Sequence, residues 1–308
     1  MANAIELRSV TKRFGQHTAV NELDLVVPEG SIYGFIGPNG SGKTTTLRMI
    51  LRIFQPDSGH VVVLGSSGGN VADDRLGYLP EERGLYKRMK VRDLLVYYAR
   101  LKGCYNCHDD IKKWLERLGA QDWVNKRIDT LSKGMAQKVQ FISAVIARPK
   151  LVILDEPFSG LDPVNMETLK EAVWSLREQG ATIVFSTHDM DTAEKMCDTI
   201  FMIFKGKKVL DGTLDDIQAH YSNDRVRVHF TDIDSGLPSL RGTSDVQRMG
   251  RFIEFRLDQV TDSQRVLQEL AGQRQLTHFQ IVKPSLHDIF VRIAKPEAAM
   301  SNGFGSET

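Results

Sequence analysis

Residues 37–44 read GPNGSGKT, which matches the pattern G-x-x-x-x-G-K-[ST]. The apolar segment SIYGFI at 31–36 precedes this stretch, and the helical segment TTLRMILRIF at 45–54 follows it. In that setting, backbone N–H groups and the amino end of the helix surround a phosphate group. The sequence therefore predicts a phosphate-binding loop, in which Gly37, Gly40 and Gly42 let the backbone wrap closely around the phosphate.

The other residues of this loop complete the predicted nucleotide site. Lys43 is expected to reach the β- and γ-phosphates, and the Thr44 hydroxyl is expected to ligate Mg²⁺. The predicted binding set also includes four neighbours along the chain: Pro38, Asn39, Ser41 and Thr45. The alternative is a glycine-rich turn before a helix, but such a turn requires neither the Lys–Thr pair nor the flanking pattern.

A second apolar segment ends in two carboxylates. LVILDEP at 151–157 places Asp155 and Glu156 at the carboxyl end of a buried strand, where α/β sheets bind ligands. One carboxylate can hold Mg²⁺ through water, and the next can orient the attacking water. Taken alone, the segment also fits a solvated acidic strand end, and the phosphate-binding loop favours the catalytic interpretation.

Apolar segments alternate with helical ones up to about residue 214. Besides the two already quoted, these segments are TIVFST at 182–187 and TIFMIF at 199–204. Continuous apolar strands separated by helices indicate a parallel sheet that is buried on both faces. The predicted fold class is therefore α/β, a P-loop nucleotide hydrolase with a mainly parallel sheet.

The pattern changes after residue 214. RVRVHF at 225–230 and RFIEFRL at 251–257 alternate apolar and polar residues, as in a half-exposed sheet, and HFQIV at 278–282 is a further predicted strand. Asp262 is expected to cap one helix, and Pro284 with Ser285 to open another. These elements predict a small α+β domain at 215–295 and a flexible tail at 296–308.

Composition excludes several classes of protein. The formal net charge of +1 argues against a protein that coats nucleic acid, so no nucleic-acid partner is expected. No apolar run approaches the roughly 20 residues that cross a bilayer, and the first residues do not form a signal peptide. Three cysteines make no disulfide framework, so we expect reduced thiols in the cytoplasm.

Further motifs extend the interpretation beyond a generic nucleotide-binding fold. LSKGMAQKVQ at 131–140 opens a helix expected to run to Pro149, FSGLDP follows LDEP at 158–163, and His188 follows a strand. This order resembles the ATP-binding subunits of ABC transporters over residues 4–214. The segment PSLHDIF at 284–290 resembles the end of a narrower group, often described as sodium-extrusion, drug-export or exoprotein-processing ATPases.

The resemblance implies a domain at 1–214, with a helical subdomain at about 82–148, that binds ATP and Mg²⁺. Phe14 would stack on adenine, and His188 would sense the γ-phosphate through a hydrogen bond. Ser132 and Gly134 would contact the γ-phosphate bound by a second copy of the domain, since Ser132 occupies a helix N-cap position. Asp162 would hold the two copies in register.

The sequence departs from the family pattern near two of these sites. Lys133 stands where glycine is commoner, and Met135 stands where glutamine is usual. Glu81 stands where the family usually has a glutamine that links Mg²⁺ and the attacking water to the membrane partner. Glutamate can still ligate a hard cation, so we expect Glu81 to change the ATPase activity without abolishing it.

The resemblance implies a cytoplasmic ATPase subunit that drives solute transport through a separate multi-span membrane permease. It would lie on the inner face of the membrane and meet a partner helix near residues 81–89 and 97–101. The alternative is a soluble ABC-type ATPase with a role in translation or regulation, although translation members usually carry two domains in one chain. The permease would select the transported solute.

The stretch CYNCH at 104–108 matches the pattern for covalent haem attachment. Nothing in the sequence directs export, which such attachment needs, and Cys104, Cys107 and His108 fall one short of four zinc ligands. We therefore expect ordinary residues of a helix and turn at this place.

Overall fold

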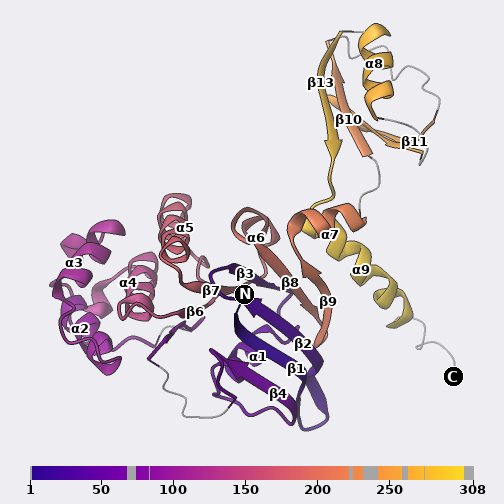
Figure 1. Cartoon of the computed structure of the whole chain (residues 1–308). Coiled ribbons are helices and arrows are strands. Elements are labelled where there is room, and N and C mark those ends of the chain that lie inside the picture. The colour runs from indigo at the N-terminus through magenta and orange to yellow at the C-terminus, as the bar shows by residue number, and fades with distance from the viewer. Residues whose placement is uncertain are drawn as a thin grey trace, which may run out of the picture. The chain divides into compact units, whose positions relative to one another are not determined.

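The structure of the chain is a computed structural model that describes residues 2–67, 74–82, 84–221, 225–231, 242–258, 263–273 and 275–301. Its contacts divide it into two compact units, Met1–Leu214 and Asp215–Thr308 (Figure 1). Each of the hydrophobic clusters described below lies wholly within one of these units.

A six-stranded sheet forms the centre of the first unit, with strand order β5-β6-β7-β3-β8-β9. The first five strands are parallel, and β9 pairs antiparallel with β8. Three of them, β3, β6 and β7, are buried along their whole length, which explains their continuous apolar sequences. The predicted α/β class is confirmed. The strands are β3 (Ile32–Ile36), β5 (Leu76–Leu79), β6 (Leu151–Asp155), β7 (Thr182–Thr187), β8 (Thr199–Phe204) and β9 (Lys207–Gly212).

A separate antiparallel sheet, with order β2-β1-β4, was not predicted from the sequence. Its strands are β1 (Asn3–Phe14), β2 (His17–Pro28) and β4 (Ser58–Val63). The pairing of β1 with β2 contains several register shifts, so the two strands do not keep a simple alternation of buried and exposed residues. Apolar residues of both strands pack in one cluster with Phe35 of β3 and Leu47 of α1 (Lys43–Ile50).

Helices α2 (Val91–Leu101), α3 (His108–Arg117) and α4 (Lys133–Val145) lie between β5 and β6 in the chain, with short 3₁₀ turns at Gln121–Trp123 and Ile128–Thr130. The expectation that α4 runs to Pro149 is wrong, because the helix ends at Val145. Arg148 adopts a left-handed φ of 53°, and the proline after it disfavours helical backbone at that residue. Helix α5 (Pro163–Glu178) packs on β7, and α6 (Met190–Met196) packs on β3.

The second unit contains a four-stranded antiparallel sheet of order β11-β12-β10-β13. Alternate residues of β10, Val226, Val228 and Phe230, pack against Val266 and Leu270 of α8 (Ser263–Gln273). The strands are β10 (Arg225–Phe230), β11 (Thr243–Met249), β12 (Phe252–Leu257) and β13 (Leu276–Val282). This sheet has its own small hydrophobic core on one face.

Helices α7 (Leu214–Tyr221) and α9 (Leu286–Ser301) flank this sheet in the chain. They are joined by a hydrogen bond from Gln218 to the Pro284 carbonyl, 3.1 Å long. Ser285 accepts a hydrogen bond from the Asp288 backbone at the start of α9. Helix α9 continues into the segment expected to be a tail, while the proposed cap Asp262 and residues 302–308 lie outside the described residues.

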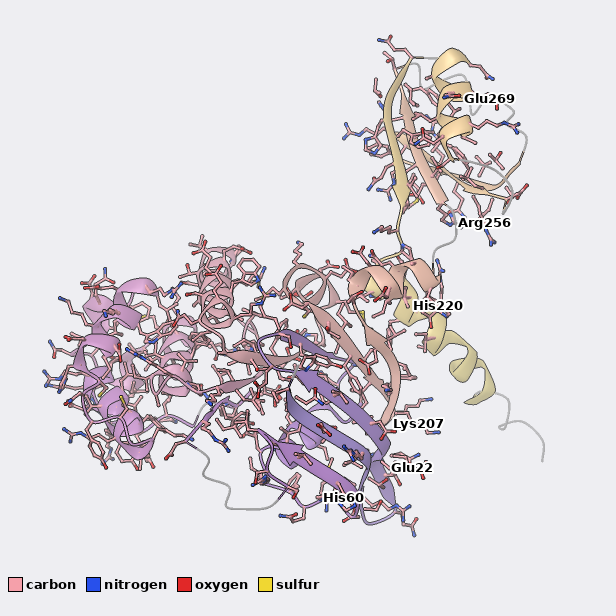
Figure 2. The ribbon with its side chains drawn as sticks, in the orientation of Figure 1. Glu22, His60, Lys207, His220, Arg256 and Glu269 are labelled. Carbon is pink, nitrogen blue, oxygen red and sulfur yellow. The ribbon has the colours of Figure 1, made fainter. Side chains whose placement is uncertain are left out.

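Polar side chains project from the surface of both units. Figure 2 labels Glu22, His60 and Lys207 on β2, β4 and β9 of the first unit, and Arg256 and Glu269 on β12 and α8 of the second. Within the described ranges, no helix combines the length and the hydropathy needed to cross a bilayer.

We expect a chain that stops after Leu214 to fold on its own. Removing the later residues deletes no member of the two hydrophobic clusters of the first unit. Its thermal midpoint should stay within about 4 °C of that of the corresponding transition in the full chain, a shift that matches ~1 kcal/mol for a domain of this size. Circular dichroism during heating measures this, and a truncated chain without a cooperative transition would contradict the boundary.

Candidate nucleotide-binding site

Four neighbouring parallel strands end at the same edge of the sheet, and each is followed by a candidate residue. The phosphate-binding loop follows β3, and His188 follows β7. Asp155 ends β6 with Glu156 directly after it, and Glu81 comes two residues after β5. Because parallel strands present their carboxyl ends together, residues far apart in the sequence come together at this edge.

The loop at 37–44 wraps tightly around its own lysine. The Lys43 ammonium group donates hydrogen bonds to the carbonyls of Gly37, at 2.6 Å, and Pro38, at 3.2 Å. Gly42 immediately precedes α1 and has a φ of 111°. A Cβ on Gly42 would lie 2.5 Å from the Ala19 carbonyl oxygen, so the loop passes too close to β2 for any side chain there.

A cavity of about 370 Å³ opens above this loop. Ten of the predicted site residues line it, and these are Phe14, Asn39, Gly40, Gly42, Lys43, Thr44, Thr45, Glu81, Asp155 and Glu156. His17 and Ala19, which no sequence motif indicated, complete the lining. Phe14 is 45% exposed and meets Phe54 edge to face, so a flat ligand can reach its ring.

The Glu156 carboxylate is held in place by its neighbours. Its Oε1 accepts a hydrogen bond from the His188 backbone at 3.1 Å and lies 2.8 Å from His188 Nδ1. The Thr187 hydroxyl donates to Oε2 at 3.4 Å. Glu156 also has a left-handed φ of 49°, a conformation that non-glycine residues adopt at a cost and that often occurs at functional sites.

Negative charge dominates the cavity. Burial lowers the pKa of Lys43, while the carboxylates of Glu156, Asp155 and Glu81 oppose that shift. Asp155 receives a hydrogen bond from the Ser186 hydroxyl on one oxygen, and its other oxygen is buried without a partner. One lysine thus faces three carboxylates, an imbalance that favours a cation at this place.

The donor set fits Mg²⁺. Carboxylate and hydroxyl oxygens of Asp155, Glu81 and Thr44 border one cavity, and Asp155 has a free buried oxygen. Among the described residues, no three acidic, histidine or cysteine side chains converge as an all-protein metal cage. Mg²⁺ is usually held by one or two protein ligands together with phosphate oxygens and water.

Seven predicted residues do not line this cavity. Gly37, Pro38 and Ser41 belong to the loop itself and His188 contacts Glu156, which leaves three residues on other elements. Ser132 caps α4 by accepting a hydrogen bond from the Met135 backbone at 3.3 Å, and Asp162 caps α5 by accepting one from Asn165 at 3.0 Å. Gly134 lies in the first turn of α4, and Leu161 would contact a Cβ placed on it. These residues therefore occupy two exposed helix starts and do not reach the loop of their own chain.

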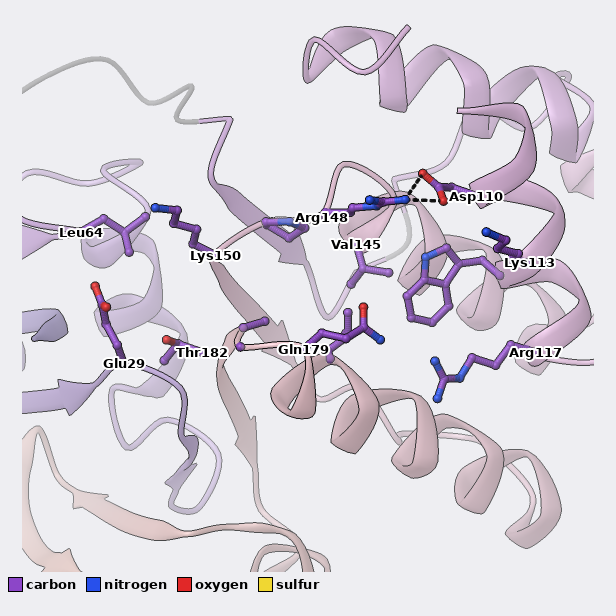
Figure 3. Close-up of a pocket in the computed structure, with 15 residues that line it drawn as sticks. Glu29, Leu64, Asp110, Lys113, Arg117, Val145, Arg148, Lys150, Gln179 and Thr182 are labelled. Atoms are coloured by element: carbon purple, nitrogen blue, oxygen red, sulfur yellow. Dashed lines mark hydrogen bonds and ion pairs between the residues drawn. The ribbon is translucent and has the colours of Figure 1, made fainter. Parts of the chain in front are cut away.

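A larger cavity, of about 780 Å³, lies where β6 and β7 begin (Figure 3). Trp114 and Arg117 of α3 line it, and the ion pair between Arg148 and Asp110 crosses it at 2.7 Å. None of the predicted site residues lines this cavity, which makes the smaller one the candidate site.

The stretch at 104–108, which matches the haem-attachment pattern, lies between α2 and the start of α3. Cys107 is buried directly before α3, and His108 is the first residue of that helix. Cys104 and Cys107 are both free thiols.

A phosphate-binding loop after a central parallel strand, with carboxylates at the carboxyl ends of other strands of the same sheet, defines a P-loop nucleotide-binding protein. Residues 20–159 match the family model described as ABC transporter. Residues 212–294 match the model described as ATP-binding protein DrrA1-3-like, C-terminal domain. The chain belongs to the family of ABC transporter ATP-binding proteins, as the order of its motifs had indicated.

The sequence similarity to known proteins extends over most of the chain. It is 44% identical to the uncharacterized ABC transporter ATP-binding protein YhaQ of Bacillus subtilis, across 92% of this chain and 95% of that protein. It is 31% identical to the Nod factor export ATP-binding protein I of a Rhizobium species, across 96% and 98% of the two chains. A solved ATP-binding subunit of an ABC transporter superposes with a TM-score of 0.66 at 29% identity, covering 71% of this chain and 93% of that chain.

Two glycine substitutions test the geometry of the loop. Gly40 has a φ of 77° and open space beyond its Cα, whereas Gly42 faces the Ala19 carbonyl. Gly40→Ala should cost roughly 1–2 kcal/mol of unfolding free energy from the left-handed backbone alone. Gly42→Ala should cost at least about 1 kcal/mol more, because backbone must also move. Urea unfolding measures both, and equal losses would contradict the close packing of the loop on β2.

Proposed function

We propose that this chain is the ATP-hydrolysing subunit of an ABC transporter and drives solute movement through a separate membrane permease. The observation that carries the proposal is the meeting of Lys43, Asp155 and Glu156 in one cavity beside the phosphate-binding loop. A loop that cradles phosphates, a buried carboxylate with a free oxygen and a second carboxylate held for proton transfer are the parts that ATP hydrolysis requires.

In the proposed mechanism the loop and Lys43 bind the β- and γ-phosphates. Lys43 exchanges its hydrogen bonds to Gly37 and Pro38 for phosphate oxygens, and the amino end of α1 favours the negative charge. Thr44 and Asp155 would hold Mg²⁺, with Glu81 as an additional oxygen ligand. The bound ion supplies neutralisation of the charge that develops on the phosphates.

Glu156 is proposed to orient the attacking water and accept its proton. The backbone of His188 and the hydroxyl of Thr187 hold the carboxylate, so it can point at a water with little loss of freedom. The His188 ring is 58% exposed and contacts Glu156, and we propose that it turns towards the γ-phosphate when ATP is bound. Phe14 is proposed to stack on adenine.

A second copy of the chain is proposed to complete each site. Ser132, Gly134 and Asp162 do not border the cavity of their own chain, and the starts of α4 and α5 near them are exposed. The amino end of α4 carries the partial positive charge that suits a γ-phosphate presented by another copy. Lys133, whose side chain lies beside Gly160, adds a cation there.

The proposed docking surface for the permease is the tyrosine surface, made of Tyr86, Tyr97, Leu101 and Tyr105. All four side chains are between 39% and 71% exposed, and the rings of Tyr86 and Tyr97 meet at 5.6 Å. Three of the four residues border a shallow cavity of about 650 Å³ on α2 and the start of α3. Exposed aromatic anchors beside a groove fit a helix from a membrane protein.

The proposed location is the cytoplasmic face of a membrane, which the chain would reach through the permease. The relatives support a transport role, since their names describe ABC transporter and Nod factor export ATP-binding proteins. None of them is named for translation, so the soluble alternative has no support of its own.

Replacing Glu156 tests the hydrolysis step. Glu156→Gln should lower ATP turnover roughly a hundredfold or more, the range lost with a general base, and keep ATP affinity close to wild type. The purified variant should also accumulate an ATP-dependent dimer, seen by size-exclusion chromatography. Glu116→Gln on α3, an equally conservative change at an exposed site, is the matched control. Turnover of Glu156→Gln near that of the control would remove Glu156 from the mechanism.

Charges on the tyrosine surface test the docking proposal. Tyr86 and Leu101 are 53% and 59% exposed, so charges at these two positions can change the surface and leave the core intact. Tyr86→Glu with Leu101→Glu should release the chain from membranes that contain the permease and leave basal ATPase activity intact. Val26→Glu on β2, also at an exposed apolar residue, is the control. Membrane recovery of the double variant equal to that of the control would place docking elsewhere.

A further inference from the structure

Helix α4 carries two buried glutamines one turn apart. Gln137 and Gln140 are each 3% exposed, which is uncommon for amide side chains unless they have hydrogen-bond partners. Gln140 Nε2 lies 3.3 Å from the carbonyl oxygen of Pro80 and 3.3 Å from that of Glu82. Both partners can only accept, so the amide nitrogen must face them and not the amide oxygen.

Only Glu81 separates the two carbonyls that Gln140 holds. Residues 80–82 follow β5 and belong to no helix or strand, so no regular ladder of backbone hydrogen bonds fixes them. The side chain of Glu81 borders the nucleotide cavity together with Asp155 and Glu156. The Gln140 amide therefore bonds the peptide groups on both sides of a residue that faces the site.

The same helix also holds the segment after Glu156. Gln137 Nε2 donates to the Pro157 carbonyl at 3.0 Å, in a fully buried hydrogen bond. Ser132, one of the residues proposed to meet the second copy, is the N-cap of α4. A single rigid helix thus contacts both carboxylate-bearing segments and the proposed interface.

The cost of burying Gln140 supports a role beyond packing. Its Oε1 is buried without a hydrogen-bond partner. A methionine would fill nearly the same volume without an orphaned acceptor, and the residues that Gln140 contacts are not buried, since Pro80 is half-buried and Glu82 is exposed. Stability alone therefore does not require an amide at this position, whereas fixing the backbone around Glu81 does.

We propose that Gln140 is a positioning residue that sets how Glu81 meets Mg²⁺, and that α4 links this contact to the second copy. The inference rests on the proposed function, because it needs Glu81 to act on the metal. Gln140 itself touches neither nucleotide nor metal. Residues that orient a metal ligand typically change metal affinity 10- to 100-fold when replaced, and the long hydrogen bonds here point to the lower end of that range.

The test measures binding, not turnover. The affinity of the full chain for a non-hydrolysable ATP analogue, AMP-PNP, is titrated by calorimetry at increasing Mg²⁺. Mg²⁺ should enhance the affinity for AMP-PNP. Gln140→Met should raise the Mg²⁺ concentration at which this enhancement is half-maximal roughly tenfold. Its urea unfolding midpoint should stay at or above that of wild type, a combination that a purely structural role would not give.

A matched control lies one turn along the same helix. The Ser143 hydroxyl donates only to the Gln140 carbonyl, within α4, at 2.7 Å. Ser143→Ala should leave the Mg²⁺ curve unchanged. Gln140→Met with a Mg²⁺ curve like that of Ser143→Ala would overturn the positioning role.

A double-mutant cycle separates this inference from the proposed function. Glu81→Ala should shift the Mg²⁺ curve at least as far as Gln140→Met, and the two changes together should shift it no further than Glu81→Ala alone. If the shifts instead multiply, Gln140 does not act through Glu81 and the inference fails, while the metal role of Glu81 stands. If Glu81→Ala leaves the curve unchanged, the proposed metal role of Glu81 fails and the inference fails with it.

Discussion

The parallel register of β5, β6, β7 and β3 is the constraint on which the rest of the site depends. Leu79 pairs with Leu154, Asp155 with Ser186, and Ile36 with Thr187, so the ends of the four strands coincide. A slip of one residue would turn Asp155 to the other face of the sheet and break its contact with Ser186. Alternate residues of these strands pack in two different hydrophobic clusters, and this packing holds the register, so core packing and catalytic geometry are two results of one arrangement.

The elements that the sequence predicts well are those whose burial is uniform. The central strands are largely apolar because both of their faces are buried, and the alternation of strands with helices along the chain indicates the parallel sheet. The antiparallel sheet of β1, β2 and β4 escaped prediction because register shifts interrupt the alternation of its residues. Strand β11 was not predicted for another reason. Nearly all of its residues are exposed, so it has no apolar face to detect.

The candidate site likewise contains residues that a sequence motif predicts and residues that no local pattern predicts. The loop around Lys43 is encoded in one continuous stretch, and five of the eight residues of its motif line the cavity. His17 and Ala19 reach that cavity through the packing of β2 on the loop, which no local pattern encodes. Gln137 and Gln140 look like ordinary polar residues of a helix, and only their burial against carbonyls of distant segments gives them a role.

The hydrogen bonds of Lys43 to Gly37 and Pro38 also bear on the speed of nucleotide capture. The lysine closes the loop on itself, so the chain alone sets its curvature. An arriving phosphate exchanges hydrogen-bond partners with a preorganised loop and does not have to order a mobile one. The conformational entropy of the loop is therefore lost once, when the protein folds, and each later encounter is limited by diffusion into the cavity and by the departure of water.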